Sequence, residues 1–195
     1  GTTTVSGGVL QVGNAGATGT LGLGDVALSN NVSLNYVRAG ATSLANNISG
    51  AGSVSANITG ATGGDLTVAG NIALTGANTV TLKATGDIVV AAGKTIGTAT
   101  GAVVLNSDSD ASGSGAIKML LGSAISTTGG SITLGGGSAG TGADYAVGNS
   151  ANPNGILLEG ASLSSGGGNI TLRGKSAADT SNYDFRSDGV RLRDA

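Results

Sequence analysis

The stretch that decides the fold is GNIALTGANTVTLKATGDIVVAAGKTIGTATGAVVL, residues 70–105. Aliphatic residues recur in it at every eighth position, at Ile72, Val80, Ile88, Ile96 and Val104. The first three of these are followed, two positions later, by a second aliphatic residue. Residues i and i+2 of a strand share one face, so each unit predicts a strand of about four residues and a turn of about four.

Turn-forming residues precede several of the predicted strands. Gly-Asp or Gly-Asn pairs precede the predicted strands at Gly64-Asp65, Gly70-Asn71 and Gly86-Asp87. Both Asp and Asn form hydrogen bonds with nearby backbone groups in turns, and glycine adopts turn conformations freely. We therefore expect these aspartates, and Asp25 in the same position, to cap turns, and corner asparagines to stack into ladders.

A longer repeat follows the regular stretch. Residues 122–134 align with residues 160–172 at an offset of 38, and residues 154–161 align with 188–195 at an offset of 34. The offsets differ because the intervening sequences differ in length. Repetition at such periods is typical of solenoids.

The composition excludes several other classes of structure. Gly accounts for 38 of 195 residues, and Gly, Ser, Thr and Asn together account for 97, which makes a helical fold costly. A net charge of −2 and a substantial Val, Ile and Leu content argue against disorder. Collagen is excluded because the chain contains one proline and no three-residue glycine period.

We therefore predict an all-β chain that forms a parallel β-helix with coils of roughly 24 residues. Residues 1–195 are expected to be one segment of a larger protein, with one type of repeat in 1–60, regular coils in 61–105 and the longer repeats in 106–195. Three stretches depart from the pattern and are predicted to project as loops: 106–114, 135–154 and 173–187.

Two sets of motifs resemble known exported proteins. The stretches VVLNSDSDASGSGAI (103–117), LGSAISTTGGSITLGGGS (121–138) and NGILLEGASLSSGGGNITLRGKS (154–176) resemble filamentous haemagglutinin-like exoproteins of two-partner secretion. The stretches TTTVSGGVLQVGNAGATGTLG (2–22) and ISGAGSV (48–54) are similar to autotransporter passenger repeats. The resemblance implies a right-handed parallel β-helix at the surface of a Gram-negative bacterium or secreted from it, and an outer-membrane transporter as a partner during export.

Catalytic chemistry finds little support in the residue types. The chain has no His and no Cys, which removes His-based triads, thiol nucleophiles and Cys/His zinc sites. Asp108 and Asp110 form an Asp-x-Asp that could touch calcium, but no known calcium-loop pattern surrounds them. We predict no enzyme activity and no cofactor or metal; the alternative is a carbohydrate-active β-helix enzyme, which would need three or more acids and a base in one groove.

One cluster is the best candidate for contact with a glycan or protein. Aromatic and arginine side chains gather near the end of the chain, at Tyr183, Phe185, Arg186, Arg191 and Arg193. Asp144 and Tyr145 are a second candidate. In residues 190–193 we expect Val190 and Leu192 to face inward and the two arginines outward. Asn31, Asn47, Asn57 and Asn169 lie in Asn-x-Ser/Thr sequences that could carry glycans.

The predicted function is therefore structural and adhesive. We expect a shaft segment of a secreted bacterial surface exoprotein that contacts a glycan or protein on a host or neighbouring cell. A self-assembling extracellular filament subunit is an alternative, because an uncapped β-helix presents open strand edges. Nucleic acid is not an expected partner at an isoelectric point near 4.8, and no run of apolar residues is long enough to span a membrane as a helix.

Overall fold

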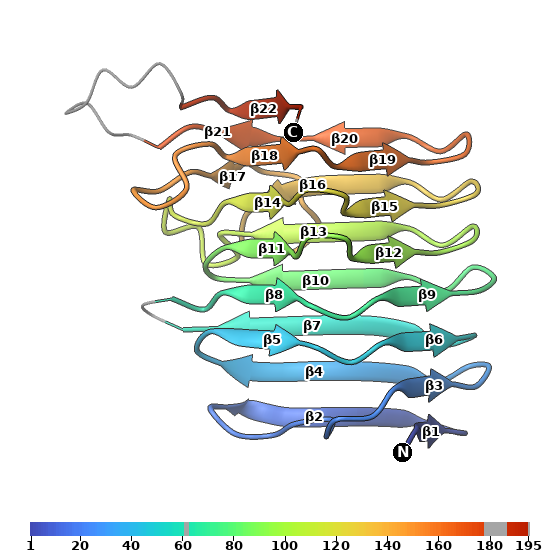
Figure 1. Cartoon of the computed structure of the whole chain (residues 1–195). Coiled ribbons are helices and arrows are strands. Elements are labelled where there is room, and N and C mark those ends of the chain that lie inside the picture. The colour runs from blue at the N-terminus through green and yellow to red at the C-terminus, as the bar shows by residue number, and fades with distance from the viewer. Residues whose placement is uncertain (61–62, 178–186, 195) are drawn as a thin grey trace.

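The computed structural model describes residues 1–60, 63–177 and 187–194. These residues contain strands and turns and no helix, as predicted, and so none that is long and apolar enough to cross a membrane. The chain winds through short strands that stack on one another from the N-terminal end to the C-terminal end (Figure 1).

Three large sheets form the sides of the stack, and a pair of short strands forms a fourth sheet. Sheet A contains, in spatial order, β1 (Thr3–Val5), β3 (Val26–Leu28), β6 (Ile48–Gly50), β9 (Ile72–Leu74), β12 (Thr95–Gly97), β15 (Ala124–Ser126) and β19 (Ser162–Ser164). Sheet B contains β2 (Val9–Gly16), β4 (Ser33–Ala39), β7 (Ser53–Thr59), β10 (Val80–Ala84), β13 (Val103–Ser107), β16 (Ile132–Gly136) and β20 (Ile170–Leu172). Sheet C contains β5 (Thr42–Leu44), β8 (Leu66–Val68), β11 (Ile88–Val90), β14 (Ile117–Met119), β18 (Ile156–Glu159) and β22 (Val190–Arg193), and sheet D pairs β17 (Ala146–Val147) with β21 (Gly174–Lys175).

Every strand pairing in these sheets is parallel and joins equivalent positions of successive coils. In sheet A, Ile72 pairs with Ile48 on one side and Ile96 on the other, so each of these coils adds 24 residues. Further along the chain, Ile132 pairs with Ile170, which confirms the offset of 38. The pairing of Ile156 with Val190 confirms the offset of 34. The fold is thus the all-β parallel stack expected of a β-solenoid.

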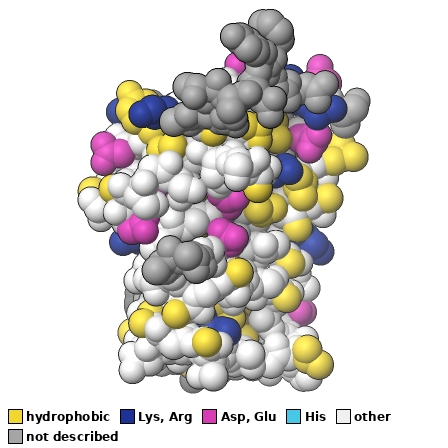
Figure 2. Space-filling model, turned by 90° about the vertical axis from the view of Figure 1, so that its left-hand side faces the viewer, with side chains coloured by type: hydrophobic (Ala, Val, Ile, Leu, Met, Phe, Trp, Pro, Cys, Tyr) yellow, Lys and Arg dark blue, Asp and Glu magenta, His cyan; other side chains and the backbone are white. Residues whose placement is uncertain are grey.

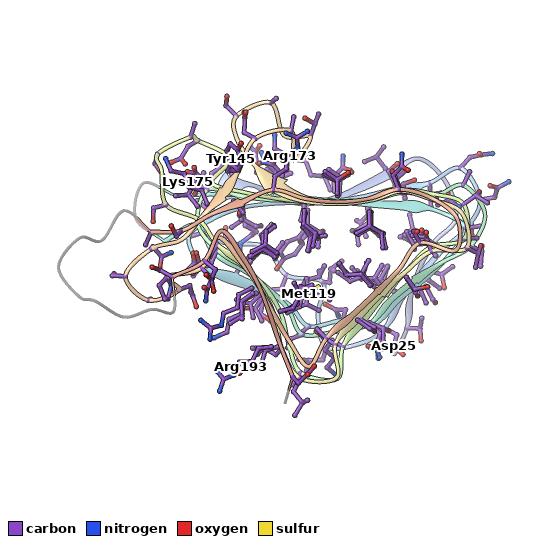
Figure 3. All side chains as sticks on the ribbon, turned by 90° about the horizontal axis from the view of Figure 1, so that it is seen from above. Asp25, Met119, Tyr145, Arg173, Lys175 and Arg193 are labelled. Atoms are coloured by element: carbon purple, nitrogen blue, oxygen red, sulfur yellow. The ribbon has the colours of Figure 1, made fainter. Side chains whose placement is uncertain are left out.

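The core is a narrow column enclosed by the three sheets. Seen along the stack, the coils outline a rough triangle whose interior is filled by side chains such as Met119, whereas Asp25 and Arg193 lie outside it (Figure 3). Two residues of most strands face inward, for example Ile88 and Val90 of β11, which are fully buried. Stacked Val, Ile and Leu fill most of the interior, because parallel pairing places the inward-facing positions of successive coils directly above one another, as Leu66, Ile88 and Ile117 are.

The eight-residue step fails at its last member. Ile72, Val80, Ile88 and Ile96 are fully buried, as predicted. Val104, however, is half-buried on the outer face, and Val103 takes the inner position between Val80 and Ile132. The corner that leads into β13 is one residue shorter than the step requires, and a shift of one residue moves a side chain to the opposite face of a strand.

Two corners of the triangle are short and tightly packed. At the corner from sheet A to sheet B, a Cβ on Gly101, Gly130 or Gly168 would overlap a carbonyl oxygen of the coil before it. These glycines are needed for the close approach of successive backbones rather than for an unusual φ. At this corner the coils therefore stack almost in contact.

The third corner, from sheet B to sheet C, carries the long segments of the chain. They follow β13 and β16, and the described residues 173–177 after β20 lie on the same side of the stack (Figure 1); residues 178–186 lie outside the described residues. The prediction of loops at 106–114, 135–154 and 173–187 is wrong in part: Asn106–Ser107 and Gly135–Gly136 end β13 and β16, and β17 and β21 form sheet D. The strands continue there because the next coil supplies hydrogen-bond partners, with Asn106 paired to Gly135 and Ser107 to Gly136.

The C-terminal end of the stack leaves part of the core uncovered. Leu192 is 74% exposed, whereas Leu158, its partner in the preceding coil, is 5% exposed. Ile170 is 44% exposed above a fully buried Ile132. In the described part of the chain, β19, β20 and β22 are the outermost strands of sheets A, B and C at this end.

Candidate functional site

The corner between sheets B and C gathers most of the unusual polar side chains. Segment 137–142 folds back over the outer face of sheet B and covers Asn106, which is fully buried. The Asn106 side chain donates to the carbonyl of Gly137 at 3.0 Å and accepts from the amide of Gly142 at 2.7 Å. Ser107, also fully buried, donates to the carbonyl of Gly115 at 2.7 Å. These hydrogen bonds fix the projecting segments to the stack.

Sheet D brings Tyr145 beside two basic residues. Ala146 pairs with Gly174 and Val147 with Lys175, and the amide of Ala146 donates to the carbonyl of Arg173 at 2.9 Å. Tyr145 therefore neighbours Arg173 across the two strands, as the labelled side chains show (Figure 3). Tyr145 is 54% exposed, and Arg173 and Lys175 are exposed as well. Together these three residues form a surface that we name the sheet D patch.

Asp144 lies at the edge of this patch. Its backbone exchanges two hydrogen bonds with Gly136, at 3.0 and 3.1 Å, in an isolated antiparallel bridge. The side chain lies beside Gly137, where a Cβ would collide with the carboxylate. Asp144 is exposed and leaves a negative charge next to the patch.

The other predicted cluster lies on a different side of the molecule. Arg191 and Arg193 lie on the outer face of β22 in sheet C, and Figure 3 places Arg193 well away from Tyr145. Arg193 forms an ion pair with Glu159 at 3.3 Å, and Arg191 forms one with Asp188 at 3.4 Å. Val190 and Leu192 continue the inner columns of Ile156 and Leu158, in agreement with the predicted alternation. Tyr183, Phe185 and Arg186 lie outside the described residues.

A polar pocket of about 300 Å³ opens at the same corner, nearer the middle of the stack. Its lining consists of Gly60, Gly63, Asp65, Thr85, Gly86, Asp87, Asp110, Ser112, Ser114, Asn149 and Ala151. Figure 2 looks onto this side of the molecule and shows acidic side chains near its middle, where the narrow N-terminal part meets the wider C-terminal part. Among the described lining residues there are three carboxylates and no Lys or Arg.

Asp87 is the most deeply buried of these acids, at 9% exposed. Its Oδ1 accepts from the amide of Ala116 at 2.7 Å and from the side chain of Asn149 at 2.8 Å, and its Oδ2 accepts from Asn152. The carboxylate is therefore fully engaged in holding segment 149–152 against the stack. This role was not apparent in the sequence, because 62 residues separate Asp87 from Asn149.

The predicted turn caps act between coils rather than within their own turns. Asp65 Oδ1 accepts from the amide of Asp87 at 2.8 Å, and Asp25 Oδ1 accepts from the side chain of Asn47 at 3.1 Å. The asparagine ladder is present: Asn47 Oδ1 accepts from the amide of Asn71, and Asn71 Oδ1 accepts from that of Thr95, both at 3.0 Å. Side chains at strand starts thus connect coils that backbone pairing already joins.

Asp108 and Asp110 accept hydrogen bonds within their own turn. Asp108 is 4% exposed and accepts from the hydroxyl of Ser112 and the amide of Gly113, each at 3.0 Å, while Asp110 accepts from the amide of Ser112 at 3.3 Å. Over residues 1–60, 63–177 and 187–194, no group of three or more acidic side chains is arranged to hold a metal ion. Both aspartates shape the turn that contains them.

Of the four Asn-x-Ser/Thr sequences, only Asn47 has a side chain committed to the ladder. Asn31, Asn57 and Asn169 are exposed. Asn31 adopts a left-handed turn with φ of 57°.

The basic members of the sheet D patch could not be recognised from the sequence. Arg173 and Lys175 are 28 or more residues from Tyr145, and only the folding of the projecting segments brings them together. Comparison of the chain with protein-family models, curated proteins and solved structures finds no match.

Proposed function

We propose that this chain is a structural and adhesive shaft segment of a secreted exoprotein on the surface of a Gram-negative bacterium. In this proposal it is a right-handed β-helix that carries its contact residues on loop inserts and performs no catalysis. It passes an outer-membrane transporter on export and contacts a glycan or protein on another cell.

The observation that carries the proposal is the continuity of the stack. Parallel pairing joins seven strands in sheet A and seven in sheet B without a break, around one aliphatic column. At about 4.8 Å per strand this gives a rod segment roughly 30 Å long in which every coil braces its neighbours. Such a rod can bear mechanical load along its axis. It also leaves the corner between sheets B and C free for contacts with a partner.

The residues of the polar pocket favour a structural role over catalysis. Asp65 and Asp87 each accept backbone hydrogen bonds from the next coil, so their carboxylates are used in holding coils together. A glycoside-cleaving site of the usual kind needs two carboxylates available to the substrate, one of them as an acid.

Surface labelling tests the proposed location. Antibodies raised against the purified chain are applied to intact cells of the source bacterium and to lysed cells. Labelling of intact cells, lost after brief protease treatment, is expected. Labelling that requires lysis would contradict the proposal, and release of oligosaccharides from purified polysaccharides by the chain would contradict its non-catalytic part.

A second candidate is a filament subunit. Leu192 and Ile170 continue the inner columns and are 74% and 44% exposed, so either a further coil of the same protein or a coil of another copy would bury them. Analytical ultracentrifugation and electron microscopy separate the two candidates. Concentration-dependent fibres would support the filament, and a monodisperse monomer at high concentration would eliminate it.

A further inference from the structure

We propose that the sheet D patch, Tyr145 with Arg173 and Lys175, binds a carboxylate-bearing polysaccharide. This inference deepens the adhesive part of the proposed function by naming the chemistry of the partner and the residues that contact it.

The first support is the arrangement of the side chains. Tyr145 and Val147 share one face of the β17 strand segment, and Arg173 and Lys175 share the same face of the neighbouring segment, because alternate residues of a strand point to one side. The two segments lie about 4.8 Å apart, and residues two positions apart along a strand are separated by about 6.6 Å. The patch is thus a small, flat grid held by backbone hydrogen bonds at 2.9 Å on both sides, from Ala146 to Arg173 and from Gly148 to Lys175.

The second support is unbalanced charge. In the described part of the chain, neither Arg173 nor Lys175 takes part in an ion pair or a side-chain hydrogen bond, unlike Arg191 and Arg193. Lys83 adds a third positive charge on the same flank, since it lies against Gly140 of the segment that leads to Tyr145. Asp144, which precedes Tyr145 in the chain and lies beside Gly137, is an exposed acid at the edge of this group. The net positive charge favours an anionic ligand.

The third support is the exposed aromatic ring. Of the two described tyrosines, Tyr36 is 4% exposed and packs inside the stack, whereas Tyr145 is 54% exposed. An exposed ring offers a flat apolar face and a hydroxyl at its edge, which suits the C–H face and the hydroxyl groups of a sugar ring. Beside it, a guanidinium can hold a carboxylate through two parallel hydrogen bonds. A sugar that carries a carboxylate can contact both the ring of Tyr145 and the guanidinium of Arg173. An acidic peptide offers the carboxylate but no sugar ring for the tyrosine.

Calorimetric titration with defined polymers tests the proposal. The ligands are polygalacturonate, its fully methyl-esterified form, dextran sulfate, which is an anionic polysaccharide without carboxylates, and polyglutamate. Polygalacturonate is expected to bind, with weaker binding as salt increases, and the ester is expected to fail because it keeps the sugar backbone but has lost the charge. Equal binding of acid and ester, no binding of the acid, or stronger binding of dextran sulfate or polyglutamate would overturn the proposal.

Matched variants then locate the site. Arg173→Gln, Lys175→Gln and Tyr145→Ala are each expected to weaken polygalacturonate binding by about tenfold, the equivalent of one charged hydrogen bond or one stacked ring. Arg193→Gln and Lys94→Gln make the same chemical changes on other sides of the stack and should leave the affinity unchanged. Asp144→Asn should tighten binding by about two- to threefold, because it removes the opposing charge.

The variants replace exposed side chains, apart from the half-buried Lys94, and circular dichroism should report an unchanged fold for each of them. Equal loss in patch and control variants would show non-specific charge binding and would reject the patch. Because surface labelling of cells does not depend on these residues, failure of the polysaccharide titration and failure of the proposed location are distinguishable.

Discussion

Whether a strand residue of this chain is buried or exposed depends on which face of the strand it occupies. Ile88 lies in the inner column of sheet C between Leu66 and Ile117, and the next residue, Val89, is half-exposed on the outside. Two aliphatic residues that are adjacent in the sequence therefore lie in different surroundings, one in the core and one at the outer surface.

Ile88→Asp should unfold the segment. The substitution places a carboxylate without a partner inside the stack, at a cost of about 3–5 kcal/mol. Val89→Asp is the matched control, and its free energy of unfolding should change by less than about 1 kcal/mol. Urea denaturation measures both. Similar stabilities for the two variants would mean that the inner and outer faces are assigned the wrong way round.

Asp87 holds three donors from two later segments, and its replacement should loosen both. Asp87→Ala leaves the buried amide of Ala116 without its acceptor and releases Asn149 and Asn152, at a cost of about 2–4 kcal/mol. Amide hydrogen exchange at Ala116 is expected to accelerate. Asp25→Ala is the control, because the exposed Asp25 accepts only from Asn47 among the described side chains; exchange as fast in this control would show that the effect is not specific to Asp87.

At the scale of strands and corners, glycine determines how closely coils approach. Gly130 stacks on Gly101, and Gly168 stacks on Gly130, with no room for a Cβ at any of the three. The short corner before β13, which shifts Val103 to the inside, is part of this column.

Gly130→Ala should push adjacent coils apart. Its Cβ would meet the carbonyl of Gly101, and relief requires backbone movement, which typically costs about 1–3 kcal/mol. Gly7→Ala adds the same methyl group in open space and should be neutral or slightly stabilising. Thermal unfolding of both variants measures the difference, and equal melting temperatures would refute the close packing of this corner.

The strands were more predictable from the sequence than the corners. Alternation of apolar residues identifies β9, β10 and β11 because burial on one face alone imposes the period. The positions of strand ends depend on contacts with the next coil. The extension of β13 through Asn106 and Ser107 therefore could not be predicted from the local sequence. Of the proposed sheet D patch, the sequence indicates only Tyr145 as a candidate. Arg173 and Lys175 lie 28 and 30 residues further along the chain, and only the pairing of β17 with β21 brings them beside it.

For the whole molecule, the parallel stack predicts a characteristic spectrum. Far-ultraviolet circular dichroism should show β-structure with almost no helical signal, since the described residues contain no helix. A spectrum dominated by helical signal would contradict the fold. The measurement needs no variant and applies to the purified chain.

The difference between the three corners also has a consequence for how such a chain can change. At the corner between sheets A and B, the column of Gly101, Gly130 and Gly168 leaves no room for a Cβ, whereas the corner between sheets B and C accommodates connections from two residues, between β4 and β5, to nine residues, between β13 and β14. A foreign peptide grafted between Ser138 and Ala139, which are exposed, should be displayed without disturbing the aliphatic column. The same peptide between Gly129 and Gly130 would separate stacked coils. Insertions are therefore expected to be tolerated at the corner between sheets B and C and to destabilise the stack at the glycine column between sheets A and B.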